Sequence, residues 1–329
     1  MNKQLQSDIL ISPVQKEQDS HILESSNAIA SQMHIFFASD DKFAQHLSVA
    51  ITSIVKNMLS CDRVNFYVLD GGISDKNKKK LSKLESKSAS IEYIAIDEKL
   101  FAHCPINPQG ASIECKHVGL QAYYRYLIPK LKPDLEKVLY LDCDLVANAS
   151  LNDLWNTELG DNYVGAVEDT YKSAKSQMKI KVDHLFNSGV MLINNKKWVK
   201  DKISDLLFEN TKLLFDKIVY VDQDVLNYTF RNKIYWLEPR YNLQQNAWFD
   251  GQRGAYSDER MEYARSRPVI AHFNGPNKPW DRYYKCRYKH KKLYGVYLRQ
   301  SPFFLEWIRW NALRFIHLLI HKQRKPEQT

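Results

Sequence analysis

Short apolar runs alternate along the chain with longer segments of helical period. Apolar runs bounded by turn residues predict buried strands, at residues 34–39, 64–69, 91–96, 138–141, 163–167, 189–193, 234–237 and 269–272. Apolar residues recurring every three or four positions predict a helix at residues 43–58. Ser74 can cap a Lys-rich helix that runs to about Glu85, and further helices are predicted at residues 117–128 and 196–210 and from Asp222. Strands that alternate with helices indicate βαβ units, so we expect an α/β protein with a mainly parallel sheet.

Length and composition fit one large folded domain with short appendages. The chain has 329 residues, of which 44% are hydrophobic and 26% are charged, enough for a sizeable core. Its five cysteines are odd in number, scattered and never spaced C-x-x-C. This pattern argues against a disulfide framework or a zinc site and favours a reducing compartment. The chain has neither a P-loop nor a dinucleotide-binding glycine motif.

The two ends of the chain differ from its middle. Residues 1–32 are polar and lack the apolar core of a signal peptide, so they predict a flexible N-terminal arm on a cytoplasmic protein. No uncharged apolar stretch reaches the roughly 18 residues of a spanning helix. Residues 282–325 contain twelve Lys or Arg and one acid, Glu306, whereas the whole chain carries a net charge of +9. The chain is therefore a near-neutral body with a basic tail.

Residues 302–321 predict an amphipathic helix with Phe and Trp on a wide apolar face and a narrow polar stripe. Two interpretations are open. The helix docks on the protein's own core, or it lies in the interface of an anionic membrane. The neighbouring positive charge favours the second, so residues 286–329 are predicted to be a basic, aromatic, membrane-associating region.

One buried strand ends abruptly in two carboxylates, Asp142 and Asp144, on either side of Cys143. Ligands of open α/β sheets bind beyond the carboxyl ends of the strands. Two carboxylates there suit Mg²⁺ or Mn²⁺, which share oxygen donors between protein and diphosphate. A strand-end Asp is also a common turn or helix cap, and a second Asp-x-Asp stands at residues 222–224. The pattern alone therefore does not decide the role of these carboxylates.

Seven short motifs follow one another between residues 33 and 285. They are FASDD (37–41), VAITSI (49–54), YRY (124–126), VLYLDCD (138–144), FNSGV (186–190), DQDVLN (222–227) and HFNGPNKPW (272–280). In this order the chain resembles glycosyltransferase family 8, most closely the bacterial lipopolysaccharide α-glucosyl- and α-galactosyltransferases. The resemblance implies a GT-A fold, a single Rossmann-like nucleotide-binding domain with a mainly parallel mixed sheet. It also implies peripheral association of residues 286–329 with the cytoplasmic face of the inner membrane.

The resemblance implies a metal-dependent, retaining transfer of glucose or galactose from a UDP-sugar to a lipopolysaccharide, lipooligosaccharide or other glycan acceptor. Asp142, Asp144 and His272 correspond to the ligands of Mn²⁺ or Mg²⁺, and an imidazole favours Mn²⁺. The residues that correspond to donor-binding positions are Ala38, Asp40, Asp41, His117, Asn187, Ser188, Gly275 and Lys278. Those that correspond to the sugar pocket and the reacting centre are Arg125, Asp169, Asp222 and Gln223.

The mechanism implied by the resemblance depends on Gln223. A double displacement needs a carboxylate nucleophile beside the anomeric carbon, and an amide is a poor nucleophile. Two routes stay open: front-face attack by the acceptor hydroxyl, or transient attack by a carboxylate such as Asp169. We favour the first. The chain departs from many relatives at Lys42, where a small polar residue is usual, and at Cys143, whose side chain is expected to point away from the carboxylates.

Two other classes of function compete with this interpretation. The basic segment 282–299 is compatible with nucleic-acid binding, which does not explain the acidic strand ends, so no nucleic-acid partner is predicted. A protein that only binds a sugar nucleotide, with weak or lost catalysis, is the other class. The presence of Asp142, Asp144 and His272 argues against it. The donor sugar, the acceptor and the linkage are left open by the sequence.

Overall fold

The computed structural model of the protein describes residues 32–106, 119–171, 179–248, 253–275, 277–280 and 288–309. Residues 1–31 of the predicted N-terminal arm, His117, and residues 286–287 and 310–329 of the predicted tail lie outside them. The strands are β1 (Gln32–Ser39), β2 (Arg63–Asp70), β3 (Ala89–Ala95), β4 (Val138–Leu141), β5 (Leu145–Ala147), β6 (Val164–Glu168), β7 (Phe186–Ile193), β8 (Ile234–Trp236), β9 (Leu243–Gln244) and β10 (Ile270–His272). The α-helices are α2 (Ala44–Asn57), α3 (Asp75–Leu81), α4 (Ile128–Leu131), α5 (Asn152–Trp155), α7 (Asn195–Lys200), α8 (Ile203–Leu213), α9 (Val221–Phe230), α10 (Asp258–Ser266) and α11 (Lys291–Gln300).

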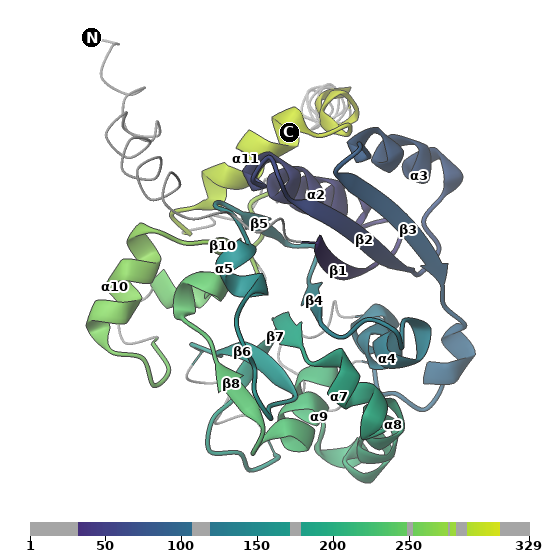
Figure 1. Cartoon of the computed structure of the whole chain (residues 1–329), viewed down its shortest axis with the longest axis vertical. Helices are drawn as coiled ribbons and strands as arrows, with labels where there is room; N and C mark the ends of the chain where they lie inside the picture. The colour runs from purple at the N-terminus through teal and green to yellow at the C-terminus, as the bar shows by residue number, and fades with distance from the viewer. Residues whose placement is uncertain are drawn as a thin grey trace, which may run out of the picture.

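Within the described residues the strands form a seven-stranded sheet, ordered β3-β2-β1-β4-β7-β6-β8, and a small sheet, ordered β5-β10-β9. Strands β3, β2, β1 and β4 are parallel, β7 is antiparallel to both β4 and β6, and β8 is parallel to β6. The predicted α/β fold with a mainly parallel mixed sheet is confirmed (Figure 1).

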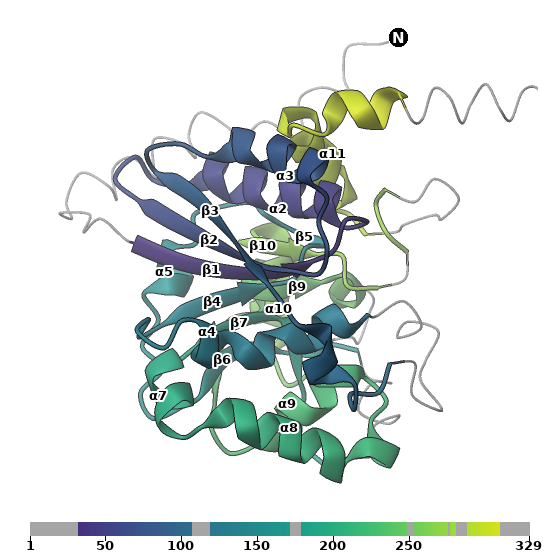
Figure 2. The same ribbon diagram turned by 90° about the vertical axis from the view of Figure 1, so that its right-hand side faces the viewer.

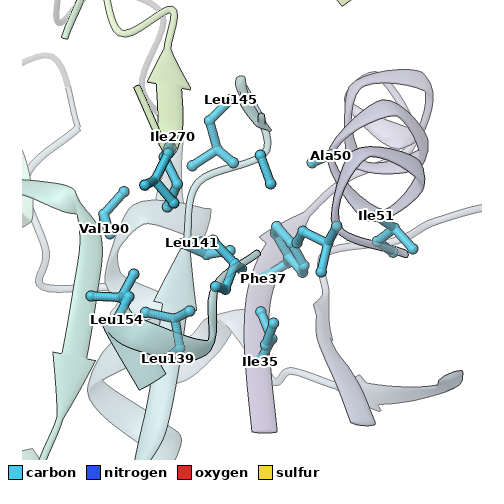
Figure 3. Close-up of a cluster of buried hydrophobic side chains, with 14 of the residues drawn as sticks. Ile35, Phe37, Ala50, Ile51, Leu139, Leu141, Leu145, Leu154, Val190 and Ile270 are labelled. Atoms are coloured by element: carbon cyan, nitrogen blue, oxygen red, sulfur yellow. The ribbon is translucent and has the colours of Figure 1, made fainter. Parts of the chain in front are cut away.

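Helices cover both faces of the large sheet. Helices α2, α3 and α11 lie on one side of β1–β3, and α4, α7, α8 and α9 lie on the other (Figure 2). Side chains alternate along each strand between these faces. Ile35 and Phe37 pack with Ile51 of α2 (Figure 3). Phe36 packs in the opposite cluster. The alternation explains why the strands, buried on both faces, are continuous apolar runs.

The order of the strands reverses between β1 and β4. Ligands of doubly wound sheets bind at such a switch point. The parallel register pairs Phe36 with Tyr140, which brings Ala38 of β1 level with Asp142. Because β7 runs antiparallel to β4, it begins at this same edge, and its Gly189 carbonyl accepts a hydrogen bond of 2.8 Å from the Asp142 amide. The ends of three strands therefore meet where the sequence places the carboxylates.

Several local predictions differ from the structure. The predicted helix 196–210 is wrong as one helix: it is two, α7 and α8, separated at Lys202, which has a left-handed φ of 50°. The predicted strand 189–193 begins three residues earlier, at Phe186. The described part of the predicted helix 117–128 is mainly a 3₁₀-helix, Leu120–Leu127. Strands β5 and β9 and helix α10 were not predicted, the strands because two or three residues carry no detectable period.

The described part of the basic region packs on the protein itself. Helix α11 lies against α2, and its Tyr294 and Leu298 are buried in one apolar cluster, whereas Phe303 beyond it is buried in the cluster of the large sheet. Beyond α11, Leu305 and Ile308 stay exposed. Most of the predicted helix 302–321 lies outside the described residues, so the choice between the two interpretations stays a prediction. In the described part of the chain no helix is long and apolar enough to cross a membrane.

Candidate active site

Two carboxylates and an imidazole meet at the switch point. Asp142 and Asp144 follow β4, and His272 ends β10, which pairs antiparallel with β5 so that His272 lies opposite Leu145. One potential ligand atom from each of the three side chains lies within 4.8 Å of the others. His272 Nε2 is 3.1 Å from Asp144 Oδ1 and 3.8 Å from Asp142 Oδ2. The structure thus brings the predicted metal ligands together.

A chain of amides sets the tautomer of His272. The Gly189 amide donates to Asn187 Oδ1 (3.2 Å), which also accepts from Asn242 Nδ2 (2.9 Å). Asn242 Oδ1 is then an acceptor, and His272 Nδ1, 2.9 Å away, carries the proton. The lone pair of His272 Nε2 therefore faces the carboxylate oxygens. Acceptors that face one another need a cation or a proton between them, so the site fits a divalent metal.

Lys278 lies on the outer side of this cluster. Its ammonium donates to Asp144 Oδ2 and to the Phe273 carbonyl, both at 2.6 Å. Burial opposes ionisation of Asp144, but the Lys278 ammonium holds the pKa of this carboxyl well below its usual range. Asp144 is therefore a permanent anion, as a metal ligand must be.

The buried guanidinium of Arg125 contacts three groups of the site. Nη1 donates to the Ser188 carbonyl (2.6 Å), Nη2 to Asp142 Oδ1 (3.1 Å), and Nε lies 3.2 Å from Asp222 Oδ2. The guanidinium stacks over Tyr140, 3.9 Å from the ring centroid. Burial alone would lower the pKa of Arg125, but the two carboxylates raise it above its ordinary value. Arg125 therefore positions the metal carboxylate as well as lining the cavity.

The amide of Gln223 is oriented by its neighbours. Its Oε1 accepts from the Ser188 amide (3.1 Å) and from Asn187 Nδ2 (3.3 Å), so its Nε2 donates to Asp169 Oδ2 (3.1 Å). The other oxygen of Asp169 accepts from the Tyr171 amide at 2.9 Å. Burial raises the pKa of Asp169. Asp169, Asn187, Ser188 and Gln223 thus form one polar group at the floor of the site.

The two carboxylates of the second Asp-x-Asp, Asp222 and Asp224, have different surroundings. Asp222 faces Arg125 in the cavity, and burial raises its pKa to about 7 although Arg125 acts in the opposite direction. Asp224 points away: its Oδ2 accepts from the amides of Val219 (2.6 Å) and Tyr220 (2.9 Å). The intervening Val221 has a left-handed φ of 50°, strained for a β-branched residue. Asp224 therefore holds the start of α9, where Asp222 and Gln223 enter the site.

Replacing Asp224 by Asn is expected to make stability less dependent on pH between about 4 and about 6. Burial raises the pKa of Asp224 from 3.8 to about 6. The folded protein therefore binds this proton more tightly than the unfolded chain, and wild-type stability falls as pH rises through the window. The Asn side chain does not titrate, and its Oδ1 still accepts from the two amides. Measured by urea unfolding, the stability of the variant relative to wild type should be higher at pH 7 than at pH 4.5. Parallel pH dependences of the two proteins would contradict the assignment.

A cavity of about 840 Å³ opens over these residues. The predicted site residues that line it are Ala38, Asp40, Arg125, Asp142, Asp144, Asp169, Asn187, Ser188, Asp222, Gln223, His272, Gly275 and Lys278. Asp41 is not brought into this set, because its Oδ1 accepts from the Ser74 amide and Asn77 Nδ2, both at 2.8 Å, at the start of α3. Asp40, besides lining the cavity, accepts from the Phe43 amide at 2.9 Å.

The structure adds residues that sequence reasoning missed. Asn242 and Gly189 set the His272 arrangement, and Phe43, 38% exposed, lines the cavity together with Lys42. Gly189 stands within a motif noted above, whereas no local signal marks Asn242. As expected, the thiol of Cys143 points away from the carboxylates, 3.3 Å from the Ala38 carbonyl.

Replacing Gly189 by Ala is expected to displace the metal ligands. A Cβ at this position would lie 2.3 Å from His272 Cε1 and 2.6 Å from Asp142 Oδ2. Neither ligand can move without opening the cluster. We therefore expect turnover of the UDP-sugar that the resemblance implies to fall about a hundredfold, because catalysis is sensitive to displacements of about 1 Å. Affinity for Mn²⁺, measured by calorimetry, should fall in parallel.

Gly165→Ala is the matched control for this change. It crowds the neighbouring strand β6, where a Cβ would lie 2.7 Å from Leu159 Cδ2, the far end of a flexible side chain. It should lower thermal stability and leave Mn²⁺ affinity intact. Equal Mn²⁺ affinities for both variants and wild type would refute the crowding argument at Gly189.

The mixed α/β sheet, with its acid–histidine cluster and its cavity at the switch point, defines a transferase of the GT-A type. The chain belongs to glycosyl transferase family 8, whose profile matches residues 34–283. It is similar to general stress protein A of Bacillus subtilis, at 30% identity over 85% of this chain and 96% of that protein. It is also similar to a lipopolysaccharide 1,2-glucosyltransferase of Escherichia coli, at 27% identity over 75% and 73% of the two chains.

A solved structure shares this fold. The crystal structure of the galactosyltransferase LgtC with donor and acceptor sugar analogues superposes with a TM-score of 0.69, at 30% identity, over 82% of this chain and 96% of that chain. The predicted family and the predicted fold are therefore both confirmed. The class of reaction is glycosyl transfer.

Proposed function

We propose that this protein is a metal-dependent, retaining glycosyltransferase that moves glucose or galactose from a UDP-sugar to a lipopolysaccharide, lipooligosaccharide or other glycan acceptor. The observation that carries the proposal is the Asp142–Asp144–His272 cluster at the edge of the large cavity, with Lys278 beside it. The cavity volume of about 840 Å³ lies within the range of roughly 300–1,000 Å³ found for small-molecule sites.

The donor is proposed to lie with its nucleotide at the end of β1 and its sugar over β7 and α9. Ala38, Asp40 and Phe43 line the first part, and an aromatic side chain suits a nucleobase. Asp142, Asp144 and His272 would hold Mn²⁺ or Mg²⁺, which neutralises diphosphate charge and so improves the leaving group. Lys278 and Gly275 line the cavity together with these ligands. A Cβ at Gly275 would lie 2.7 Å from Gln245 Oε1, so glycine allows the chain to pass close to Gln245.

Front-face transfer is the route that the side chains favour. Asp169 and Gln223 hydrogen-bond each other, and both oxygens of Asp169 accept a bond. These groups are therefore arranged to bind sugar hydroxyls, while the acceptor hydroxyl attacks from the side of the departing diphosphate and gives it its proton. The raised pKa of Asp169 keeps the alternative, transient attack by this carboxylate, open to test.

The decisive experiment is hydrolysis of UDP-glucose and UDP-galactose by the purified full chain with Mn²⁺. Release of UDP from one of them, abolished by a chelator and by Asp142→Ala, is the expected result. No turnover of any sugar nucleotide, or unchanged activity in Asp142→Ala, would refute the proposal. Binding of UDP without turnover would instead identify a sugar-nucleotide-binding protein.

Residues 286–329 are proposed to attach the enzyme to an anionic membrane at the cytoplasmic face. The described part ends in a helical turn where Leu305 and Ile308 are exposed, next to the side chains of Lys76 and Lys80 that pair with Glu306. Apolar side chains beside cationic ones fit an interfacial helix.

Liposome flotation tests the attachment. The full chain is compared with a chain stopped after Arg309, because a stop nearer Gln300 would remove Phe303 from the core. The full chain should float with vesicles containing anionic lipid, and the shortened chain should bind far less. Equal flotation of the two would remove the membrane proposal without affecting the activity proposed above.

A further inference from the structure

Helix α11 reaches the site through one tyrosine. The hydroxyl of Tyr294 lies 2.7 Å from Nδ1 of His46 and accepts a hydrogen bond of 3.1 Å from Gln45 Nε2. Gln45 and His46 belong to α2. Because Gln45 donates to the tyrosine oxygen, the tyrosine proton is directed to His46 Nδ1, and Nε2 of His46 carries the ring proton. Burial agrees with this neutral form, since it lowers the pKa of His46 to about 3.

The face of His46 supports Trp280. The two rings stack with centroids 3.8 Å apart and an interplanar angle of 24°, and Tyr294 packs against the same indole at 4.9 Å. Trp280 lines the cavity and follows Lys278 by two residues. The Lys278 ammonium lies 5.8 Å from the indole centroid and 2.6 Å from Asp144. A continuous series of contacts therefore joins α11 to the cation beside the metal cluster.

In the segment that carries Lys278, the described residues 273–275 and 277–280 have no regular secondary structure. Its described anchors are short contacts: Gln245 Nε2 donates to the Asn277 carbonyl at 3.0 Å, and Lys278 bonds the Phe273 carbonyl. A segment of this kind keeps one conformation only if side chains hold it. The stack of Trp280 on His46 supplies that support next to Lys278.

We infer that Tyr294 and His46 are positioning residues for the diphosphate end of the donor, because they hold Trp280 and so keep Lys278 beside Asp144. The inference rests on the proposed function and deepens it. It also extends the site's support beyond the residues that match the family profile, since that match ends at residue 283 and Tyr294 lies in α11. Helix α11, the first helix of the region 286–329, thus also supports the site.

Tyr294→Phe, with Tyr297→Phe as its control, tests the inference. Each change removes one buried hydroxyl from α11 and keeps the ring. The Tyr297 hydroxyl accepts from Asn57 Nδ2 at 2.8 Å, and Asn57 in turn bonds the Ala147 carbonyl, so this contact faces β5 and not the cavity. The control therefore loses a buried hydroxyl on the same helix, but one whose hydrogen bond does not lead to the cavity.

We expect Tyr294→Phe to raise the KM for the UDP-sugar and the Kd for UDP about five- to tenfold, with a smaller change in kcat. Tyr297→Phe should leave these constants near the wild-type values while lowering the melting temperature by a similar amount. Trp280 provides an independent signal. The fluorescence of Trp280 is obtained by subtracting the spectrum of the same protein with Trp280→Phe. This difference spectrum should shift to longer wavelength in Tyr294→Phe and stay unchanged in Tyr297→Phe.

The outcomes separate the two proposals. If the wild-type chain neither turns over a UDP-sugar nor binds UDP, the proposed function fails and this inference fails with it. If the wild type is active and the two variants share one KM, one Kd and one Trp280 emission, the positioning role alone is refuted.

Discussion

Turnover of the UDP-sugar is expected to fall about a thousandfold or more in Asp144→Asn, because a metal-supported leaving group is worth several kcal/mol. The amide keeps the size of the carboxylate and removes its charge. The cluster can keep its hydrogen bonds, since the new Nδ2 can donate to His272 Nε2, which now faces an oxygen 3.1 Å away, and the amide oxygen can accept from Lys278. The rise in melting temperature that Mn²⁺ causes in wild type should disappear.

Asp161→Asn is the matched control. Asp161 is an exposed carboxylate that pairs with the ammonium groups of Lys197 and Lys233, as Asp144 pairs with Lys278. Its replacement changes the net charge equally and should leave both turnover and the effect of Mn²⁺ intact. Turnover of Asp144→Asn within tenfold of wild type, or an undiminished response to Mn²⁺, would contradict the metal site.

Arg125→Gln is expected to cause the largest loss of stability in the site, about 3–5 kcal/mol, the cost of leaving a buried charge without its partner. The side chain of Arg125 is only 3% exposed and faces the carboxylates of Asp142 and Asp222. The size of the loss should depend on pH. The pKa of Asp222 is already raised by burial to about 7, and loss of Arg125, which lowers it, raises it further.

The sign of this pH dependence follows from the raised pKa. When a carboxyl binds its proton more tightly in the folded protein, its folded pKa lies above its unfolded pKa. The protein then loses stability as pH rises from the unfolded pKa to the folded pKa. In the variant this window extends above 7, so the deficit relative to wild type should be smaller at pH 5.5 than at pH 8. Urea unfolding at the two pH values measures it.

Two further variants separate charge from shape at Arg125. Adding Asp222→Asn to Arg125→Gln should recover much of the stability, because the unpaired carboxylate is gone. Arg125→Lys keeps the charge but not the fork that reaches the Ser188 carbonyl and Asp142 together, so it should be more stable than Arg125→Gln and still turn over slowly. If the added Asp222→Asn recovers nothing, the buried pair is not the cause of the loss.

The site was predicted from the sequence to different extents. Asp142 and Asp144 were found because an apolar run ending in carboxylates is visible in the order of residues alone. His272 lies 128 residues after Asp144 in the chain and was predicted only from its place in the ordered family motifs. The structure places its ring against the two carboxylates. Asp41 was predicted from the same kind of motif, yet its carboxylate holds the start of α3.

Interactions that depend on the direction of a strand or the partner of an amide were out of reach. The register of β7 against β4 brings Asn187 and Ser188 to the carboxylates, and an apolar run of this kind is equally compatible with parallel pairing. The role of Asn242 exists only because Asn187 and His272 meet on either side of it. The break between α7 and α8 likewise depends on one backbone conformation at Lys202.

The sequence by itself determined the α/β class, most of the strands, the strand-end carboxylates and the family, because burial period and residue order are properties of the chain. The tertiary structure alone decided which oxygen faces the lone pair of His272, that Arg125 holds carboxylates as well as lining the cavity, and that α11 supports Trp280. Hydrogen bonds and ring stacking act over a few ångströms between residues far apart in the chain, so only the folded arrangement specifies them.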